Sequence, residues 1–338
     1  MGGPVLEPIV PSLAQIEAAA RELLQREPGP VVRHLLLRDV LRQPCGSRER
    51  AAARRAIDDC RAVLVLAAEQ RADGGWGRFH TAERGASGRV PCTEYGLERA
   101  LALGLDARHP MLHRAADHLA SILRGEVAFP DPPERNDRWP TGVRLFVAAA
   151  LARLRPDHTA LAHERRLWRD IASDTFASGH YDAAREAAAH ARRTGATVTG
   201  SYLVLNSRYH LELLGSDPEG LSPSFEAGLL RWLWQRPDGI GYLDAPLQRP
   251  PAARPGALDR WLRSHELLAR LFPSWRHHAG PVVDWLWRAR MDDGQWDLGP
   301  RPRSSPVLPL SDDWRHRERR AADWSVRVLV VLRRSCEA

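Results

Sequence analysis

Apolar residues recur along this chain at intervals of three to four, the spacing at which they line one face of a helix. Two segments with one apolar face run over residues 111–123 and 161–172, and each leads into a polar turn. Other segments are apolar around most of their circumference, and they start at Thr93, Thr141, Ser201, Trp261 and Asp323. Because a helix that is apolar on all sides is buried, the pattern predicts pairs of outer and inner helices. No segment alternates as a half-buried strand does, so we expect an all-α protein.

Three of the helix pairs share a turn built on Asp-Gly and followed by an aromatic residue. The turns read Asp73-Gly-Gly-Trp76, Asp238-Gly-Ile-Gly-Tyr242 and Asp293-Gly-Gln-Trp296. The second and third aspartates are 55 residues apart, and the first and second are 165 apart, three times that distance. A period of this length predicts degenerate copies near Asp131 and Asp182.

Units of this period fit into the 338 residues about six times. Residues 5–45 would form an atypical first unit, and residues 50–335 would hold the units with Asp-Gly turns. Six helix pairs can close a ring, and we therefore predict one domain over residues 1–338, an (α/α)6 toroid with a central cavity.

The segment from Gln70 through Asp73-Gly-Gly-Trp76 resembles the Q-W repeat of squalene-hopene-type cyclases and the related repeat of protein prenyltransferase β subunits. The turns at Asp238 and Asp293 are weaker copies, so the resemblance covers roughly residues 50–335. It implies the toroid of the terpenoid-cyclase and prenyltransferase kind, with the Trp as a helix cap. It also implies an enzyme of the isomerase type, which starts the cyclisation or rearrangement of an isoprenoid with an acid. The substrate of such an enzyme can carry a diphosphate.

Charge and composition narrow the classes of partner. The net charge is +7, and all 49 basic residues are Arg, whose planar fork suits carboxylate or phosphate. These charges are spread along the chain rather than gathered with aromatic residues in a basic stripe, so we expect no nucleic-acid partner. No secretory signal and no apolar run of about 20 residues occurs. We therefore expect a cytoplasmic protein with no transmembrane segment.

Motifs that would indicate a cofactor or metal are missing. The four cysteines lie far apart, and no Gly-rich phosphate loop, H-E-x-x-H or D-D-x-x-D pattern is present. We expect no cofactor and no metal site, and a small molecule as the ligand.

Polar residues on the inner helices are the candidates for the site, because those helices expose one stripe to the central cavity. Alignment of the inner helices by their apolar ends gives a first level of Glu94, Arg144, Trp261 and Asp323. The next level, one turn further, holds Glu98, Tyr209, His265 and Arg327. The candidate acids or bases are Glu94, Glu98, His265 and Asp323, and the candidate anion-binding residues are Arg144, Arg208 and Arg327. Tyr209, Trp261 and Trp324 would complete the substrate-binding set, where indole rings can face a cation.

Other interpretations of the same residues stay open. The charges could simply pair, Asp323 with Arg327 and either Glu94 or Glu98 with Arg144. The same barrel could also carry a carbohydrate-active enzyme, either a glycoside hydrolase or a lyase, because its centre combines carboxylates, His, Arg and Trp. A third possibility is a ligand-binding protein without catalysis. The sequence leaves the substrate, the product and the oligomeric state open.

Overall fold

The computed structural model describes residues 9–83, 87–198, 201–217, 220–251, 256–300, 302 and 305–337. The chain is 57% helical, with 14 α-helices and no strand in these ranges, which confirms the predicted all-α fold. It divides into two compact units, one of Met1–Cys60 with Ala245–Ala338 and the other of Arg61–Asp244. Closure into one toroid stays a prediction.

The unit that holds both ends of the chain is built around its last helix. Its helices are α1(Leu13–Gln25), α2(Pro30–Leu35), α3(Arg48–Ile57), α12(Ala257–Leu271), α13(Gly280–Arg288) and α14(Arg317–Ser335). Short π and 3-10 turns occupy Leu36–Val40 and Pro273–His277. Helix α14 is buried without interruption over residues 321–329 and packs against α1, α12 and α13. It is therefore one of the two inner helices that the sequence predicts in this unit.

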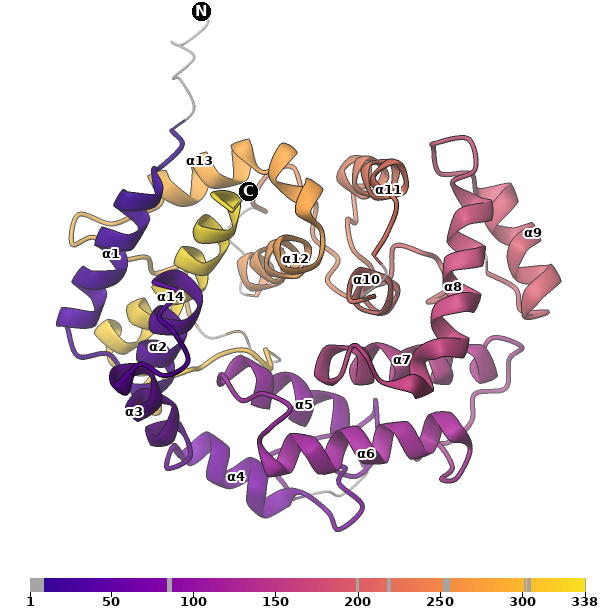
Figure 1. Cartoon of the computed structure of the whole chain (residues 1–338), viewed down its shortest axis with the longest axis horizontal. Helices are drawn as coiled ribbons and strands as arrows, with labels where there is room; N and C mark the ends of the chain where they lie inside the picture. Colours follow the sequence, from indigo (N-terminus) through magenta and orange to yellow (C-terminus); the bar gives the residue numbers. More distant parts are fainter. Residues whose placement is uncertain are drawn as a thin grey trace, which may run out of the picture. The chain divides into compact units, whose positions relative to one another are not determined.

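The central unit, Arg61–Asp244, contains the other eight α-helices. They are α4(Arg61–Glu69), α5(Thr93–Ala102), α6(Pro110–Arg124), α7(Trp139–Leu154), α8(Ala162–Thr175), α9(Ala183–Arg193), α10(Arg208–Gly215) and α11(Pro223–Gln235), with a 3-10 turn at Thr159–Leu161. Helix α7 lies between α6 and α10 (Figure 1) and packs against both. Residues 209–214 of α10 are all buried. Helices α7 and α10 thus form the interior of this unit and carry polar side chains into it.

The Asp-Gly turns at Asp73 and Asp293 have the same structure. Trp76 and Trp296 are 3% and 0% exposed, and each indole Nε1 donates to a carbonyl ten residues earlier in the preceding helix. Each Trp backbone N–H donates to a hydroxyl of the following helix, Thr93 in one copy and Ser325 in the other. The Trp therefore caps the first helix of a pair and ties the turn to the second, at the first residue of α5 in one copy and within α14 in the other.

The remaining copies depart from this plan. The carboxylate of Asp131 accepts hydrogen bonds from the backbone N–H groups of residues 79–81, and Asp182 caps the N-terminus of α9. At Asp238 the turn has one more residue before its aromatic side chain, Tyr242, which is 40% exposed. The helix expected from Ser201 begins only at Arg208, because residues 201–207 form successive turns.

Candidate functional site

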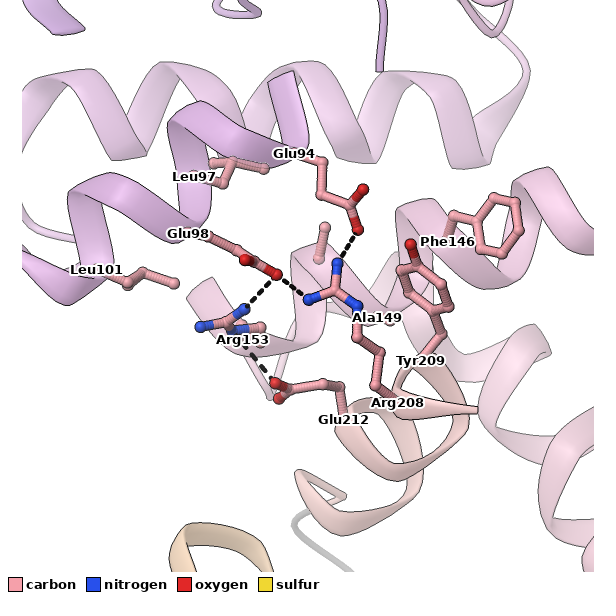
Figure 2. A pocket seen from close by; sticks show the side chains of 11 residues that line it. Glu94, Leu97, Glu98, Leu101, Phe146, Ala149, Arg153, Arg208, Tyr209 and Glu212 are labelled. Atoms are coloured by element: carbon pink, nitrogen blue, oxygen red, sulfur yellow. Dashed lines mark hydrogen bonds and ion pairs between the residues drawn. The ribbon is translucent and has the colours of Figure 1, made fainter. Parts of the chain in front are cut away.

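Two carboxylates of α5 and one arginine of α10 form the centre of a buried charge cluster in the central unit. Glu94 and Glu98 are four residues apart and lie on one face of α5. Arg208, the first residue of α10, donates to both carboxylates (Figure 2). The hydroxyl of Ser207 accepts from the backbone at the start of α10 and so fixes the point from which Arg208 extends.

The cluster continues across α7. The Nη1 of Arg153 lies 3.5 Å from Oε1 of Glu98, and its Nε lies 3.5 Å from Oε1 of Glu212 on α10 (Figure 2). Charges of opposite sign therefore alternate from Glu94 to Glu212, with three carboxylates for two arginines. Glu98 and Glu212 are only 7% and 5% exposed, and buried charges need such partners. The free space between these side chains is about 20 Å³, room for one water molecule and not for a substrate.

His80 contacts a carboxylate of the charge cluster and the neighbouring Tyr209. Its Nδ1 lies 2.8 Å from Oε2 of Glu94 and 3.3 Å from the Tyr209 hydroxyl. The bond from its backbone N–H to Asp131 fixes the loop that carries it. Its side chain is 30% exposed, and the described part of the chain supplies no hydrogen bond to Nε2. The sequence gives no signal for His80, because a single histidine in a loop has no periodic pattern.

The protonation states follow from this arrangement. Burial is the largest influence on Glu94 and raises its pKa, but Arg208 and His80 together outweigh it and lower that pKa to about 2. The hydrogen bond with Glu94 raises the pKa of His80 by more than burial lowers it. Burial raises the pKa of Tyr209 well above its usual value. At neutral pH Glu94 is therefore ionised and Tyr209 is a neutral phenol, and the pKa of His80 lies above that of a free imidazole.

Aromatic contacts link His80 to a larger cleft. The His80 ring stacks on Phe146 at 5.4 Å and meets the ring of Tyr242 edge-on at 6.0 Å. Phe146 also contacts Tyr202 at 5.3 Å. Tyr202 and Tyr242 line a cleft of about 480 Å³ that has Arg138 among its walls. The volume suits a small ligand, so this cleft and His80 form the candidate site.

Arg144 does not join the cluster, and its expected ion pair with Glu94 or Glu98 is wrong. Its Nε lies 2.6 Å from Glu164, and its Nη1 donates to the carbonyl of Leu123. Arg144 and Arg153 are nine residues apart on α7, which places them on opposite sides of the helix at about 100° per residue. Arg153 is therefore the arginine that lies on the side of α7 facing α5 and α10.

Asp323 and Arg327 take part in different networks. Asp323 accepts from the backbone N–H groups of Leu310 and Ser311 at 2.6 and 2.9 Å and from the Ser311 hydroxyl. Arg327 pairs with Asp259 and Glu266 at 2.6 and 2.7 Å. Both networks belong to the unit of Met1–Cys60 and Ala245–Ala338 and serve to join its loops and helices.

The remaining sequence candidates are also in that unit. His265 is fully buried, which lowers its pKa to about 3, and its Nδ1 accepts from Trp275. The Trp261 ring packs edge-on against His265, and Trp324 donates to the carbonyl of Gly299. Glu94, Glu98, Arg208 and Tyr209 come together in the central unit, whereas His265, Asp323, Trp261, Trp324 and Arg327 belong to the other unit.

Two further properties concern the described residues only. They contain no group of three or more His, Cys, Asp or Glu side chains arranged to hold a metal ion. None of their helices is both long and apolar enough to cross a membrane. Comparison with family models, curated proteins and solved structures gives no match to this chain.

Proposed function

We propose that the central unit carries an acid–base catalytic site centred on His80, which acts on a small polar molecule in the adjacent cleft. One observation carries this proposal. The Nδ1 of His80 is held by a carboxylate that an arginine holds in turn, while the side chain is 30% exposed and the described residues supply no hydrogen bond to Nε2. A carboxylate in this position fixes the tautomer and orientation of the imidazole and leaves Nε2 to exchange protons.

The charges around His80 suit a side chain that accepts a proton from the substrate and later returns it. Neutral His80 would accept a proton from the substrate at Nε2, and ionised Glu94 would stabilise the resulting imidazolium. Tyr209, as a neutral phenol, can donate a hydrogen bond to an oxygen within reach. A positioned general base of this kind contributes about 10²- to 10⁴-fold to a rate.

The test is turnover with and without the imidazole. We would incubate the protein with a panel of sugar acids, glycosides and prenyl diphosphates and follow each compound by mass spectrometry. For any compound converted, His80→Gln should lower kcat by about 100-fold or more. His113→Gln, on the exposed face of α6, is the matched control and should leave kcat unchanged. Full activity of His80→Gln would refute the proposal.

A second candidate is an enzyme of the terpenoid-cyclase and prenyltransferase kind. It is favoured by the five rings of His80, Phe146, Tyr202, Tyr209 and Tyr242, which contact one another and could stabilise a carbocation. Because the low pKa of Glu94 keeps that carboxylate ionised, a cation here would form by loss of diphosphate rather than by protonation from Glu94. Release of hydrocarbon products from prenyl diphosphates in the same panel would favour this candidate.

A further inference from the structure

The cleft beside Tyr242 contains an arginine without a carboxylate partner. We call it the Tyr242 cleft; its walls include Arg138, Tyr202, Asn206, Arg236, Tyr242 and Asp244. Within the described residues no carboxylate pairs with Arg138, and its Nε is buried without a hydrogen bond. The Nε of Arg236 is likewise buried without a hydrogen bond, but Arg236 has a carboxylate partner, because its Nη2 donates to Asp238 at 2.6 Å. An anionic ligand in the cleft would supply the missing charge partner of the Arg138 guanidinium.

The position of Arg138 favours an anion for a second reason. It is the N-cap residue of the 16-residue helix α7, and no side chain caps this helix end. The N-terminus of a helix carries partial positive charge and free N–H groups. The guanidinium and the helix end would therefore both attract an anion.

Tyr242 gives the cleft an exposed ring on a strained backbone. In the intact Asp-Gly turns the aromatic residue is the third after the aspartate, and it is buried as a helix cap. The turn at Asp238 has one more residue, so Gly241 takes the third position and Tyr242 is left 40% exposed. Tyr242 has φ +70°, and Asp244 beside it has φ +47°. Left-handed conformations are unfavourable for a residue with a side chain, and they are concentrated at ligand sites.

We propose that the Tyr242 cleft binds a hydroxylated ring that carries a carboxylate, the chemistry of a sugar acid. The carboxylate would bind Arg138, and one face of the ring would lie on Tyr242. Asn206 and Asp244, which also line the cleft, would accept hydrogen bonds from the hydroxyls. The proposal deepens the function proposed above and rests on it, because the bound ring would lie beside His80, which contacts Tyr242.

Three compounds test the contributions of the ring and of the carboxylate separately. D-Glucuronate has both the ring and the carboxylate, D-glucose has the ring alone, and acetate has the carboxylate alone. Titration calorimetry on the full chain should show glucuronate binding about tenfold or more tightly than either of the others. Equal affinity for acetate would refute the contribution of the ring, and equal affinity for glucose would refute the contribution of Arg138. Absence of saturable glucuronate binding would refute the site.

Variants assign the binding to the named side chains. Arg138→Gln should weaken glucuronate binding about tenfold without changing the affinity for glucose, and Arg124→Gln, at the exposed end of α6, is the control. Arg138→Lys keeps the charge and loses the planar fork, so it tests the same contact should the Gln variant unfold. Tyr242→Asn removes the ring but tolerates the left-handed backbone, and it should weaken both ring compounds. Unchanged affinities would refute these assignments.

His80→Gln separates this proposal from the catalytic one. We expect it to bind glucuronate within about twofold of the unchanged protein, since His80 is not needed for the contact with Arg138. Loss of turnover with retained binding supports both proposals. Binding without any turnover in the unchanged protein would refute catalysis of this ligand and leave the binding site standing. A loss of binding in His80→Gln would refute the claim that the ligand binds independently of His80.

Discussion

The protonation state of each ionisable side chain in the candidate site depends on its neighbours. Glu94 stays ionised because Arg208 and His80 outweigh the effect of its burial, and His80 holds its proton more firmly because Glu94 is ionised. Neither property is visible in the residue types alone. Each depends on a contact between α5, α10 and the loop that carries His80.

The first prediction concerns the proton of His80. Glu94→Gln removes the negative charge that raises the pKa of His80 and leaves the effect of burial, so that pKa should fall below its value in the unchanged protein. An NMR titration of the His80 imidazole measures it directly. Glu126→Gln, a fully exposed position on the same unit, should leave the His80 titration unchanged. A His80 pKa unaffected by Glu94→Gln would contradict the coupling.

The second prediction concerns Arg208. Arg208→Gln leaves Glu94 and Glu98 buried without their main partner, and breaking a buried pair in this way costs about 3–5 kcal/mol. Urea denaturation should show that loss in the free energy of unfolding. Arg124→Gln is the comparison, because Arg124 and its partner Glu126 are 46% and 52% exposed and lie outside the cluster. We expect a clearly smaller loss there, and equal losses would argue against the central role of Arg208.

Helices and turns follow the sequence closely where the pattern is local. Helix α5 begins at Thr93 as predicted, and α7 begins at Trp139, two residues before the predicted start. The helix predicted from Ser201 was wrong in its start, because Ser201 accepts from the backbone of Leu203 and Ser207 caps α10. Short polar side chains compete with the helix for backbone groups in this way.

The third prediction concerns the Trp caps. Trp76→Ala or Trp296→Ala should lower the free energy of unfolding by about 3 kcal/mol or more, because each change leaves a buried cavity and removes a cap. Trp314→Ala, at a half-buried position, should cost less. Chemical denaturation of the three variants compares them. A loss of only a few tenths of a kcal/mol at Trp76 would contradict its role in the turn.

Buried histidines give the whole molecule a pH dependence. Burial, the largest influence on each, lowers the pKa of His34 and His190 to about 4, that of His265 to about 3, and that of His210 well below its usual value. The ring nitrogens of His190 and His210 have no hydrogen-bond partner in the described residues. These four histidines remain neutral in the folded chain where they take up protons in the unfolded one.

The fourth prediction follows from that difference. In the unfolded chain these groups bind protons below about pH 6.5, so the free energy of unfolding should fall as the pH drops from 7 to 5. Each group contributes at most about 1.4 kcal/mol per pH unit. His80 acts in the opposite direction, because its pKa is raised. Urea denaturation at several pH values measures the sum, and His210→Phe should make the dependence less steep. A stability that stays constant between pH 7 and 5 would contradict this account.

The sequence by itself determined the helices, their buried faces and the Asp-Gly turns, because these depend on residues within one or two turns of each other. It also placed Glu94 and Glu98 on one face of a helix, which needs only their spacing of four. Tertiary structure decided which cations meet those carboxylates, and it selected Arg208 and Arg153 rather than Arg144. It also brought His80 and Tyr242 together from separate loops. Loop paths and the register between helices arise from packing across the unit, and no local pattern records them.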